Sequence, residues 1–318
     1  MVFKSMKTIR TIIASFCLVC LCSCTTQKPI PLSLPAEVPF DIKLGVRPIF
    51  VKLHLEDGRE LPFMLDTGSP ETFLDKSLES KLGKRLETIK LPYGWKEYGA
   101  PACGVYAPPK LYLGNTRLQT GRQVFTDDLT RIWPGRPMMG ILGMDCLQNY
   151  CLQLDFQAMK LRFLDPGHPQ DGNLGRAFPI TWFSGEVSTR IDFCGKKDAR
   201  FALDTADYAD GALKAGLFQL ALDKQESVWT LQYKTNGISY RVAYLPKCAI
   251  NGGTNTQLAF RDSSMGAVCS ENILGLAFFA RNLTTFNFPK RVMYLKQTSI
   301  GPFTNKTSRT NAVPAKKL

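Results

Sequence analysis

The stretch Phe63-Met64-Leu65-Asp66-Thr67-Gly68 occurs a second time, 138 residues further on, as Phe201-Ala202-Leu203-Asp204-Thr205-Ala206. At the same offset, Leu53 and Leu55 correspond to Ile191 and Phe193. Apolar and polar residues alternate around Leu53–Leu55 and around Ile191–Phe193, which is typical of half-buried strands. A polar, glycine-containing turn lies between the two segments of each pair. Both regions therefore predict a β-hairpin whose second strand ends on an aspartate.

A second matched pair lies downstream. Ile141-Leu142-Gly143-Met144-Asp145 corresponds to Ile273-Leu274-Gly275-Leu276-Ala277, and a hairpin-like pattern follows each of them. Matched elements in the same order indicate an internal duplication. Helical patterns are short and scarce, the clearest being residues 76–84 and 213–222. The sequence predicts a mainly β fold made of two related halves, and its 318 residues suit two domains of about 100–150 residues each.

An apolar strand that ends in Asp-Thr-Gly and is followed by Ile-Leu-Gly resembles the retropepsin-like and pepsin-like aspartic proteases. The spacing between the two motifs is 75 residues in the first copy and 69 in the second. The form Ile141–Asp145 is most similar to cellular and bacterial retropepsin-like members. The likeness covers roughly residues 45–165 and 185–298 and is stronger in the first copy. It implies a bilobal acid-protease double barrel with pseudo-twofold symmetry.

The resemblance also implies a catalytic site. Asp66 and Asp204 would be the catalytic pair, with Thr67 and Thr205 joining their loops through hydroxyl groups and Gly68 bringing backbone close to a carboxylate. Two carboxylates held together cannot both ionise, so they share one proton and can serve as base and acid. The implied activity is an aspartic endopeptidase that hydrolyses peptide bonds with a water activated between two aspartates. It needs no metal and no cofactor.

The second motif departs from the family pattern because Ala206 stands where the first copy has Gly68. A position that needs positive φ or a close backbone approach would strain an alanine by about 1–2 kcal/mol. Asp207 and Asp210 follow closely, and their charge is expected to shift the pKa values of the pair. The alternative is a non-catalytic envelope lipoprotein that keeps the fold as a peptide- or polymer-binding module.

Other candidates are assigned lesser roles. Tyr93–Gly104 and Gly237–Tyr240 are expected to form flaps over the substrate. Asp145 is expected at the rim of its domain or as a cap of the next helix. His54 and His168, the two histidines of the chain, are expected at the surface. An alternative is a dimer in which the first lobes of two chains pair with each other. Because one chain carries both aspartates, we expect a monomer.

The N-terminus predicts export. Three basic residues within the first ten precede an apolar run, Ile12–Leu21, that is too short to span a bilayer as a helix. Leu21-Cys22-Ser23-Cys24 resembles the lipobox of bacterial lipoproteins, which implies that Cys24 carries diacylglycerol and becomes the mature N-terminus. An ordinary signal peptide cleaved nearby is the alternative. The expected location is the bacterial cell envelope, lipid-anchored and facing the periplasm or the exterior.

Removal of the expected signal peptide changes both the number of cysteines and the net charge of the mature chain. Six of the ten cysteines lie beyond the expected signal and lipidation site: Cys103, Cys146, Cys151, Cys194, Cys248 and Cys269. None forms Cys-x-x-Cys, and because six cysteines allow 15 connectivities, no pair is predicted. Removal of the signal lowers the net charge from +13 to about +10. In an exported protein this indicates a solvated basic face rather than nucleic-acid binding, with anionic lipid headgroups as a secondary hypothesis.

These patterns predict six segments. They are a signal peptide (1–24), a tether (25–44), a first retropepsin-like lobe (45–165), a linker (166–184), a second lobe with the degenerate motif (185–300) and a basic tail (301–318). The expected partners are a polypeptide substrate and, through the lipid anchor, a membrane.

Overall fold

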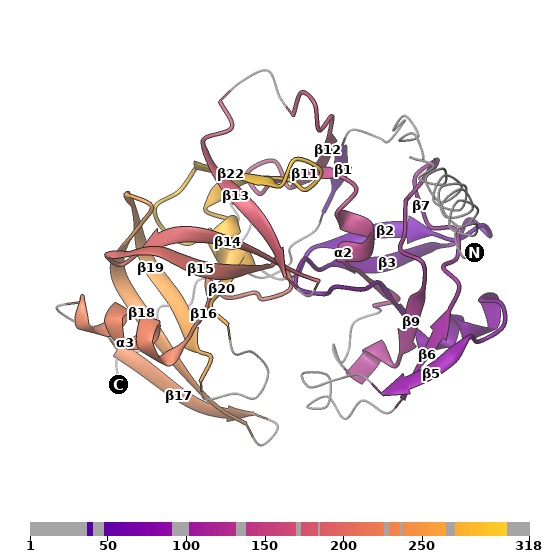
Figure 1. The fold of residues 1–318 in the computed structure, drawn as a ribbon, viewed down its shortest axis with the longest axis horizontal. Coiled ribbons are helices and arrows are strands. Elements are labelled where there is room, and N and C mark those ends of the chain that lie inside the picture. Colours follow the sequence, from indigo (N-terminus) through magenta and orange to yellow (C-terminus); the bar gives the residue numbers. More distant parts are fainter. Residues whose placement is uncertain are drawn as a thin grey trace, which may run out of the picture. The chain divides into compact units, whose positions relative to one another are not determined.

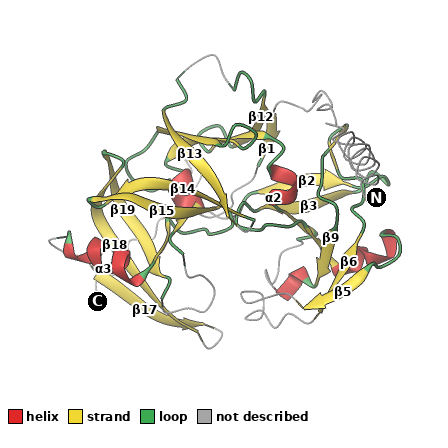
Figure 2. Cartoon of the chain, viewed as in Figure 1, coloured by secondary structure: helices red, strands yellow, loops and turns green. Residues whose placement is uncertain are grey.

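The structure is a computed structural model. It describes residues 37–40, 48–90, 102–131, 138–169, 173–183, 185–225, 229–235, 238–264 and 271–303. In this part of the chain strands dominate and form two large sheets, so the mainly β prediction is confirmed (Figures 1 and 2). No helix in these ranges is long and apolar enough to cross a membrane. The expected signal peptide and Cys24 lie outside the described residues.

The first sheet contains nine strands among the described residues, in the order β5-β6-β9-β4-β10-β3-β2-β7-β8. Their bounds are β2 (Phe50–His54), β3 (Glu60–Leu65), β4 (Phe73–Asp75), β5 (Glu87–Lys90), β6 (Ala102–Tyr106), β7 (Tyr112–Leu113), β8 (Thr116–Arg117), β9 (Val124–Asp127) and β10 (Gly140–Leu142). Val51 and Leu53 of β2 are buried and Lys52 between them is exposed, as alternation predicts.

The second sheet contains thirteen strands in the described ranges, in the order β1-β12-β11-β21-β22-β13-β14-β15-β20-β16-β19-β18-β17. Their bounds are β1 (Glu37–Pro39), β11 (Cys151–Asp155), β12 (Lys160–Leu164), β13 (Arg176–Phe183), β14 (Glu186–Phe193), β15 (Lys196–Asp204), β16 (Gly211–Leu213), β17 (Trp229–Thr235), β18 (Ile238–Ile250), β19 (Gly253–Asp262), β20 (Ile273–Gly275), β21 (Asn282–Asn287) and β22 (Val292–Gln297). Because β11 pairs with β21, strands from both copies share this sheet.

The two copies repeat the same central pairings. In the first copy (residues 45–165), β10 lies parallel to β3 and antiparallel to β4, which in turn lies parallel to β9. In the second copy (residues 185–300), β20, β15, β16 and β19 repeat these relations in the same order. The matched sequence motifs therefore occupy matched places in the strand order.

The helices of the described residues are short and few (Figure 2). They are η1 (Lys76–Lys81), η3 (Leu129–Arg131), α2 (Met144–Leu147), α3 (Ala215–Asp223) and α4 (Leu276–Phe279). The predicted helical stretches at 76–84 and 213–222 coincide with η1 and α3. A Cβ on Gly143 would lie 2.2 Å from the carbonyl oxygen of Glu71, and one on Gly275 would lie 2.3 Å from that of Ala209. The glycine of each Ile-Leu-Gly motif is thus required by a close backbone approach.

The segment boundaries differ from the prediction at three places. Residues 176–183 of the expected linker form β13, which pairs with β22 and then with β14 and so joins two parts of the sheet (Figure 1). Residues 37–39 of the expected tether form β1, paired with β12. Phe303 of the expected tail packs with its ring 5.6 Å from that of Phe156. In each case apolar side chains find partners in the core, which composition alone did not indicate.

One disulfide is present among the described cysteines. It joins Cys194, between β14 and β15, to Cys248 in β18. Cys146 and Cys151 are buried and free, Cys103 is buried, and Cys269 lies outside the described residues. The disulfide closes a sequence separation of 54 residues within the second copy.

Candidate functional site

Two aspartates come directly from strands that are fixed on both sides. Asp66 follows β3 and Asp204 ends β15, and the apolar residues before each aspartate are buried. The amide of Asp66 donates to the carbonyl of Leu142 at 3.1 Å, and Asp204 pairs with Gly275 in β20. The Ile-Leu-Gly strands therefore hold the start of each aspartate loop.

Reciprocal hydrogen bonds join the two loops. The amide of Thr67 donates to Oγ1 of Thr205 at 3.0 Å, and the amide of Thr205 donates to Oγ1 of Thr67 at 3.1 Å. Each hydroxyl then donates to a carbonyl of the other copy, that of Leu203 or Leu65, at 2.8 Å. Both threonines are fully buried. The four bonds fix the two Asp-Thr segments against each other.

The carboxyl groups of Asp66 and Asp204 are held in the same way. In each case Oδ1 accepts two backbone amides from the residues that follow. The donors are Gly68 and Ser69 for Asp66, at 2.8 and 3.1 Å, and Ala206 and Asp207 for Asp204, at 2.8 and 3.0 Å. The two carboxyl groups lie within hydrogen-bonding reach of each other. Asp66 is buried and Asp204 is half-buried.

Burial sets the charge state of this pair. Desolvation raises the pKa of Asp66, and the negative charge of Asp204 raises it further. Desolvation also raises the pKa of Asp204, followed by the charge of Asp207. The backbone amides that each Oδ1 accepts work in the opposite direction. Because adjacent buried carboxylates repel, the pair can hold one proton in common over a range of pH.

Gly68 and Ala206 differ in their surroundings rather than in backbone strain. Neither residue has a positive φ, so the strain expected for Ala206 on that ground is absent. A Cβ on Gly68 would lie 2.7 Å from Cγ of Asp204, closer than real contacts allow. Ala206 packs instead against a buried apolar cluster of the first copy that includes Met64 and Phe73. The first loop therefore requires glycine at residue 68, because the Asp204 carboxyl leaves no room for a side chain there.

Arginines neutralise the two further aspartates of the second loop. Asp207 forms an ion pair with Arg261. Asp210 forms an ion pair with Arg281, with Nε 2.8 Å from Oδ1, and accepts the amide of Ala259 at 2.8 Å. The sequence predicted the negative charges but missed both arginines. They lie 54 and 71 residues from their partners, so no local motif could have found them.

Asp145 and His168 lie outside the aspartate pair. Asp145 lies in the first turn of α2 but does not cap it, since Gly143 occupies the cap position. Its carboxylate accepts the hydroxyl of Thr72 at 2.6 Å and the amide of Gly121 at 3.1 Å. The side chain of His168 is 88% exposed, as expected.

His54 lies on the same face of β2 as the exposed Lys52, opposite the buried Val51 and Leu53, which is the outward placement that the sequence predicts. Its ring is half-buried, with contacts of 2.7 Å to the carbonyls of Leu55 and Gly114, and it stacks on Tyr112. Tyr112 and the two carbonyls thus cover part of a ring that stays on the outward face of the strand.

The expected flaps lie largely outside the described residues. Residues 91–101, which connect β5 and β6, are not described, and neither is Gly237. On either side of these gaps the strands pair antiparallel, β5 with β6 and β17 with β18. Flap formation by these segments stays a prediction.

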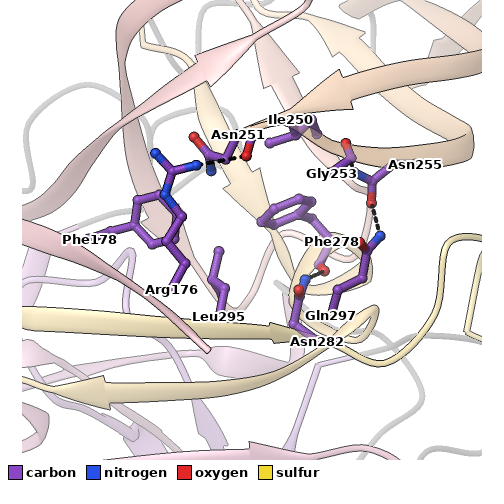
Figure 3. A pocket seen from close by; sticks show the side chains of 10 residues that line it. All are labelled: Arg176, Phe178, Ile250, Asn251, Gly253, Asn255, Phe278, Asn282, Leu295 and Gln297. Carbon is purple, nitrogen blue, oxygen red and sulfur yellow. Dashed lines mark hydrogen bonds between the residues drawn. The ribbon is translucent and has the colours of Figure 1, made fainter. Parts of the chain in front are cut away.

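A pocket of about 140 Å³ lies elsewhere, in the second copy and β13 (Figure 3). It is lined by Arg176, Phe178, Ile250, Asn251, Gly253, Asn255, Phe278, Asn282, Leu295 and Gln297, and thus by neither aspartate of the pair. Arg176 donates to the carbonyl of Asn251 at 2.7 Å and lies over the ring of Phe178, so its guanidinium already has partners within the fold. In the described ranges, no three His, Cys, Asp or Glu residues group so as to hold a metal ion.

Comparison with models of known protein families gives no match for this sequence, and a search of curated proteins gives none either.

Proposed function

We propose that this protein is an aspartic endopeptidase with a bilobal, acid-protease-like double-barrel fold, in which Asp66 and Asp204 activate a water molecule. One observation carries the proposal. The reciprocal bonds between Thr67 and Thr205 bring two carboxyl groups from separate copies within hydrogen-bonding reach. Two rigid loops with adjacent carboxyls are what water-based peptide hydrolysis needs in the absence of a nucleophilic side chain.

The proposed reaction uses the proton that the pair shares. The ionised carboxylate takes a proton from water while the water oxygen attacks the carbonyl carbon of the peptide bond. The protonated carboxyl gives its proton to the carbonyl oxygen, forming a tetrahedral diol. Collapse of the diol breaks the C–N bond, with one proton passing to the leaving nitrogen. The pair then returns to its singly protonated form.

The backbone donors orient both acids for this role. On each side the two amides bond to Oδ1, so we assign the proton transfers to the Oδ2 atoms of Asp66 and Asp204. Hydrogen bonds from the backbone fix the carboxyl planes, which limits reorganisation during the reaction.

The alternative, a non-catalytic binding module, was motivated by Ala206. That residue has a negative φ and contacts apolar side chains of the first copy, so its backbone gives no reason to regard the second loop as distorted. We therefore favour the enzyme over the binding module.

A polypeptide is the proposed substrate, and a monomer is the proposed form of the protein.

We also propose that the protein is anchored in the bacterial envelope through diacylglycerol on Cys24. Cells that express the full chain would be labelled with a fatty-acid analogue. Wild type should incorporate label and Cys24→Ala should not, and equal labelling of both would contradict the assignment of Cys24.

The function is tested by cleavage of a peptide library with purified wild type, Asp66→Ala and Asp204→Ala. Wild type should cleave and be inhibited by a statine-type compound, and both variants should be inactive. Asp145→Asn is the matched control, because it changes a partly buried carboxylate outside the pair. Cleavage by Asp66→Ala at the wild-type rate would contradict the mechanism. Absence of cleavage in a wild type that still binds peptides would favour the binding module.

A further inference from the structure

The two aspartate loops differ at the residue that follows Gly68 or Ala206. In the first copy this residue is Ser69, whose hydroxyl donates within its own loop to the carbonyl of Glu71 at 2.7 Å. In the second copy it is Asp207, whose carboxylate reaches out of the loop to Arg261 in β19. An ion pair thus connects the Asp204 loop to a neighbouring strand. In the Asp66 loop, by contrast, the equivalent side chain, that of Ser69, bonds only within its own loop.

Asp207 contacts both the pair and the arginine. Its amide donates to Oδ1 of Asp204 at 3.0 Å, and its own Oδ1 accepts the amide of Ala209 at 3.1 Å. Its side chain is only 3% exposed, while that of Arg261 is 30% exposed. Arg261 lies opposite Ala212 in the β16–β19 pairing, so the strand that carries it is fixed to the second loop.

Three charged groups act on Asp204: Asp66 from the other loop, Asp207 from its own loop and Arg261 from β19. The charge of Asp207 raises the pKa of Asp204, and that of Arg261 lowers it. Asp207 in turn raises the pKa of Arg261, which stays charged. Without the arginine, Asp204 would face two carboxylates and would hold its proton more tightly.

We propose that Arg261, acting through Asp207, is a positioning residue that lets Asp204 act as the ionised base of the pair. The inference rests on the proposed function. It assigns the role of base to Asp204, whose loop carries a second carboxylate that Arg261 neutralises. The first copy has Ser69 at the equivalent position, and because this residue is neutral, Asp66 needs no such arginine.

The test compares Arg261→Gln, Arg261→Lys and Arg241→Gln. Arg241 is a matched control, because it forms a similar ion pair with Asp262 between β18 and β19. In Arg261→Gln the acid limb of the kcat/KM profile should move to higher pH by about one unit, and Arg261→Lys should restore most of it. Arg241→Gln should leave the limb in place. An unchanged limb in Arg261→Gln, or an equal shift in Arg241→Gln, would overturn the proposal.

A second readout does not depend on activity. Titration of carboxyl carbons by NMR in the full-length chain, assigned with Asp66→Asn and Asp204→Asn, follows the pair directly. Asp204 should titrate at higher pH in Arg261→Gln than in wild type. If wild type titrates in this way but cleaves no peptide, the proposed function fails while the effect of Arg261 stands. If Asp204 titrates alike in both proteins, the role of Arg261 fails.

A double variant guards against misfolding of Arg261→Gln, which leaves a buried carboxylate unpaired. Asp207→Ser with Arg261→Met removes both charges and copies the serine of the first loop. The charge of Asp207 raises the pKa of Asp204 by more than the charge of Arg261 lowers it. With both charges removed, Asp204 should therefore titrate at a lower pH than in wild type. A shift in the upward direction would contradict the proposal.

Discussion

The amide of Thr67 donates to the hydroxyl of Thr205, and the amide of Thr205 donates to the hydroxyl of Thr67, at 3.0 and 3.1 Å. Each threonine hydroxyl therefore supplies the hydrogen-bond acceptor that a buried backbone amide of the other copy needs at the end of its strand. The arrangement works in both directions at once, because each hydroxyl accepts one bond and donates another. It links residues 138 positions apart at the place where the two aspartates meet.

Thr67→Val or Thr205→Val should destabilise the protein. Either change leaves a buried amide and a buried carbonyl of the other copy without partners, and each unpaired group costs about 1–3 kcal/mol. We expect a loss of about 2–4 kcal/mol in the free energy of unfolding, measured by urea denaturation. Serine at either position keeps the hydroxyl and should lose much less. Thr88, exposed in β5, is the control site. Equal losses for Thr67→Val and Thr88→Val would speak against the account.

The stability of wild type should fall as pH rises above the ordinary aspartate range. Asp66 and Asp204 have raised pKa values in the folded state, so the folded chain keeps protons that the unfolded chain releases. The stabilisation is complete below the unfolded pKa near 3.8 and is lost as pH rises through the folded values.

Asp66→Asn removes one of these charges. Relative to wild type it should gain stability between pH 4 and pH 8, by at least about 1.4 kcal/mol, the energy of one pKa unit. Urea unfolding at several pH values measures this, with the exposed Asp223→Asn as control. A stability difference that does not change with pH would show that the pair is not electrostatically strained.

Gly68→Ala and Ala206→Gly should have unequal effects. The new methyl on residue 68 would lie 2.7 Å from Cγ of Asp204, so that carboxyl must move. Overpacking of this kind costs about 1–3 kcal/mol, and we expect peptide cleavage to fall at least about tenfold. Ala206→Gly removes a small apolar contact and should cost about 1 kcal/mol or less while keeping activity. Full activity in Gly68→Ala would refute the steric role of this glycine.

The Cys194–Cys248 disulfide should stabilise the second copy. Replacing both cysteines with alanine should lower the free energy of unfolding by about 2–4 kcal/mol. A reductant should have a similar effect on wild type and none on the double variant. Cys146 and Cys151 are free, so neither of them offers the reductant a bond to break. Equal sensitivity of both proteins to reductant would contradict the role of this bond.

The sequence was informative where the structure depends on local pattern. The strand before Asp66, its counterpart before Asp204 and the Ile-Leu-Gly strands are visible because apolar residues repeat at fixed spacing. Their pairing follows from the duplication, since equivalent segments occupy equivalent places. Candidate residues for the pair came from these same segments.

Long-range partners were not visible from sequence. Arg261 and Arg281 lie on a strand and a turn with no motif of their own, and only the folded chain brings them to Asp207 and Asp210. β13 lies in the segment predicted as a linker (166–184), because residues 166–173, which precede the strand, are rich in proline, glycine and polar residues. Its backbone is nevertheless paired on both halves, with β22 and with β14.

The central claim is that Asp66 and Asp204 act as one catalytic unit. A double-mutant cycle of kcat/KM for one cleaved peptide, with Asp66→Asn, Asp204→Asn and the double variant, tests it most directly. Residues that act as a unit are non-additive, so each single variant should lose at least about a thousandfold and the double variant should lose no more. Substantial activity in either single variant, or additive losses in the double variant, would contradict the shared role of the two carboxyl groups.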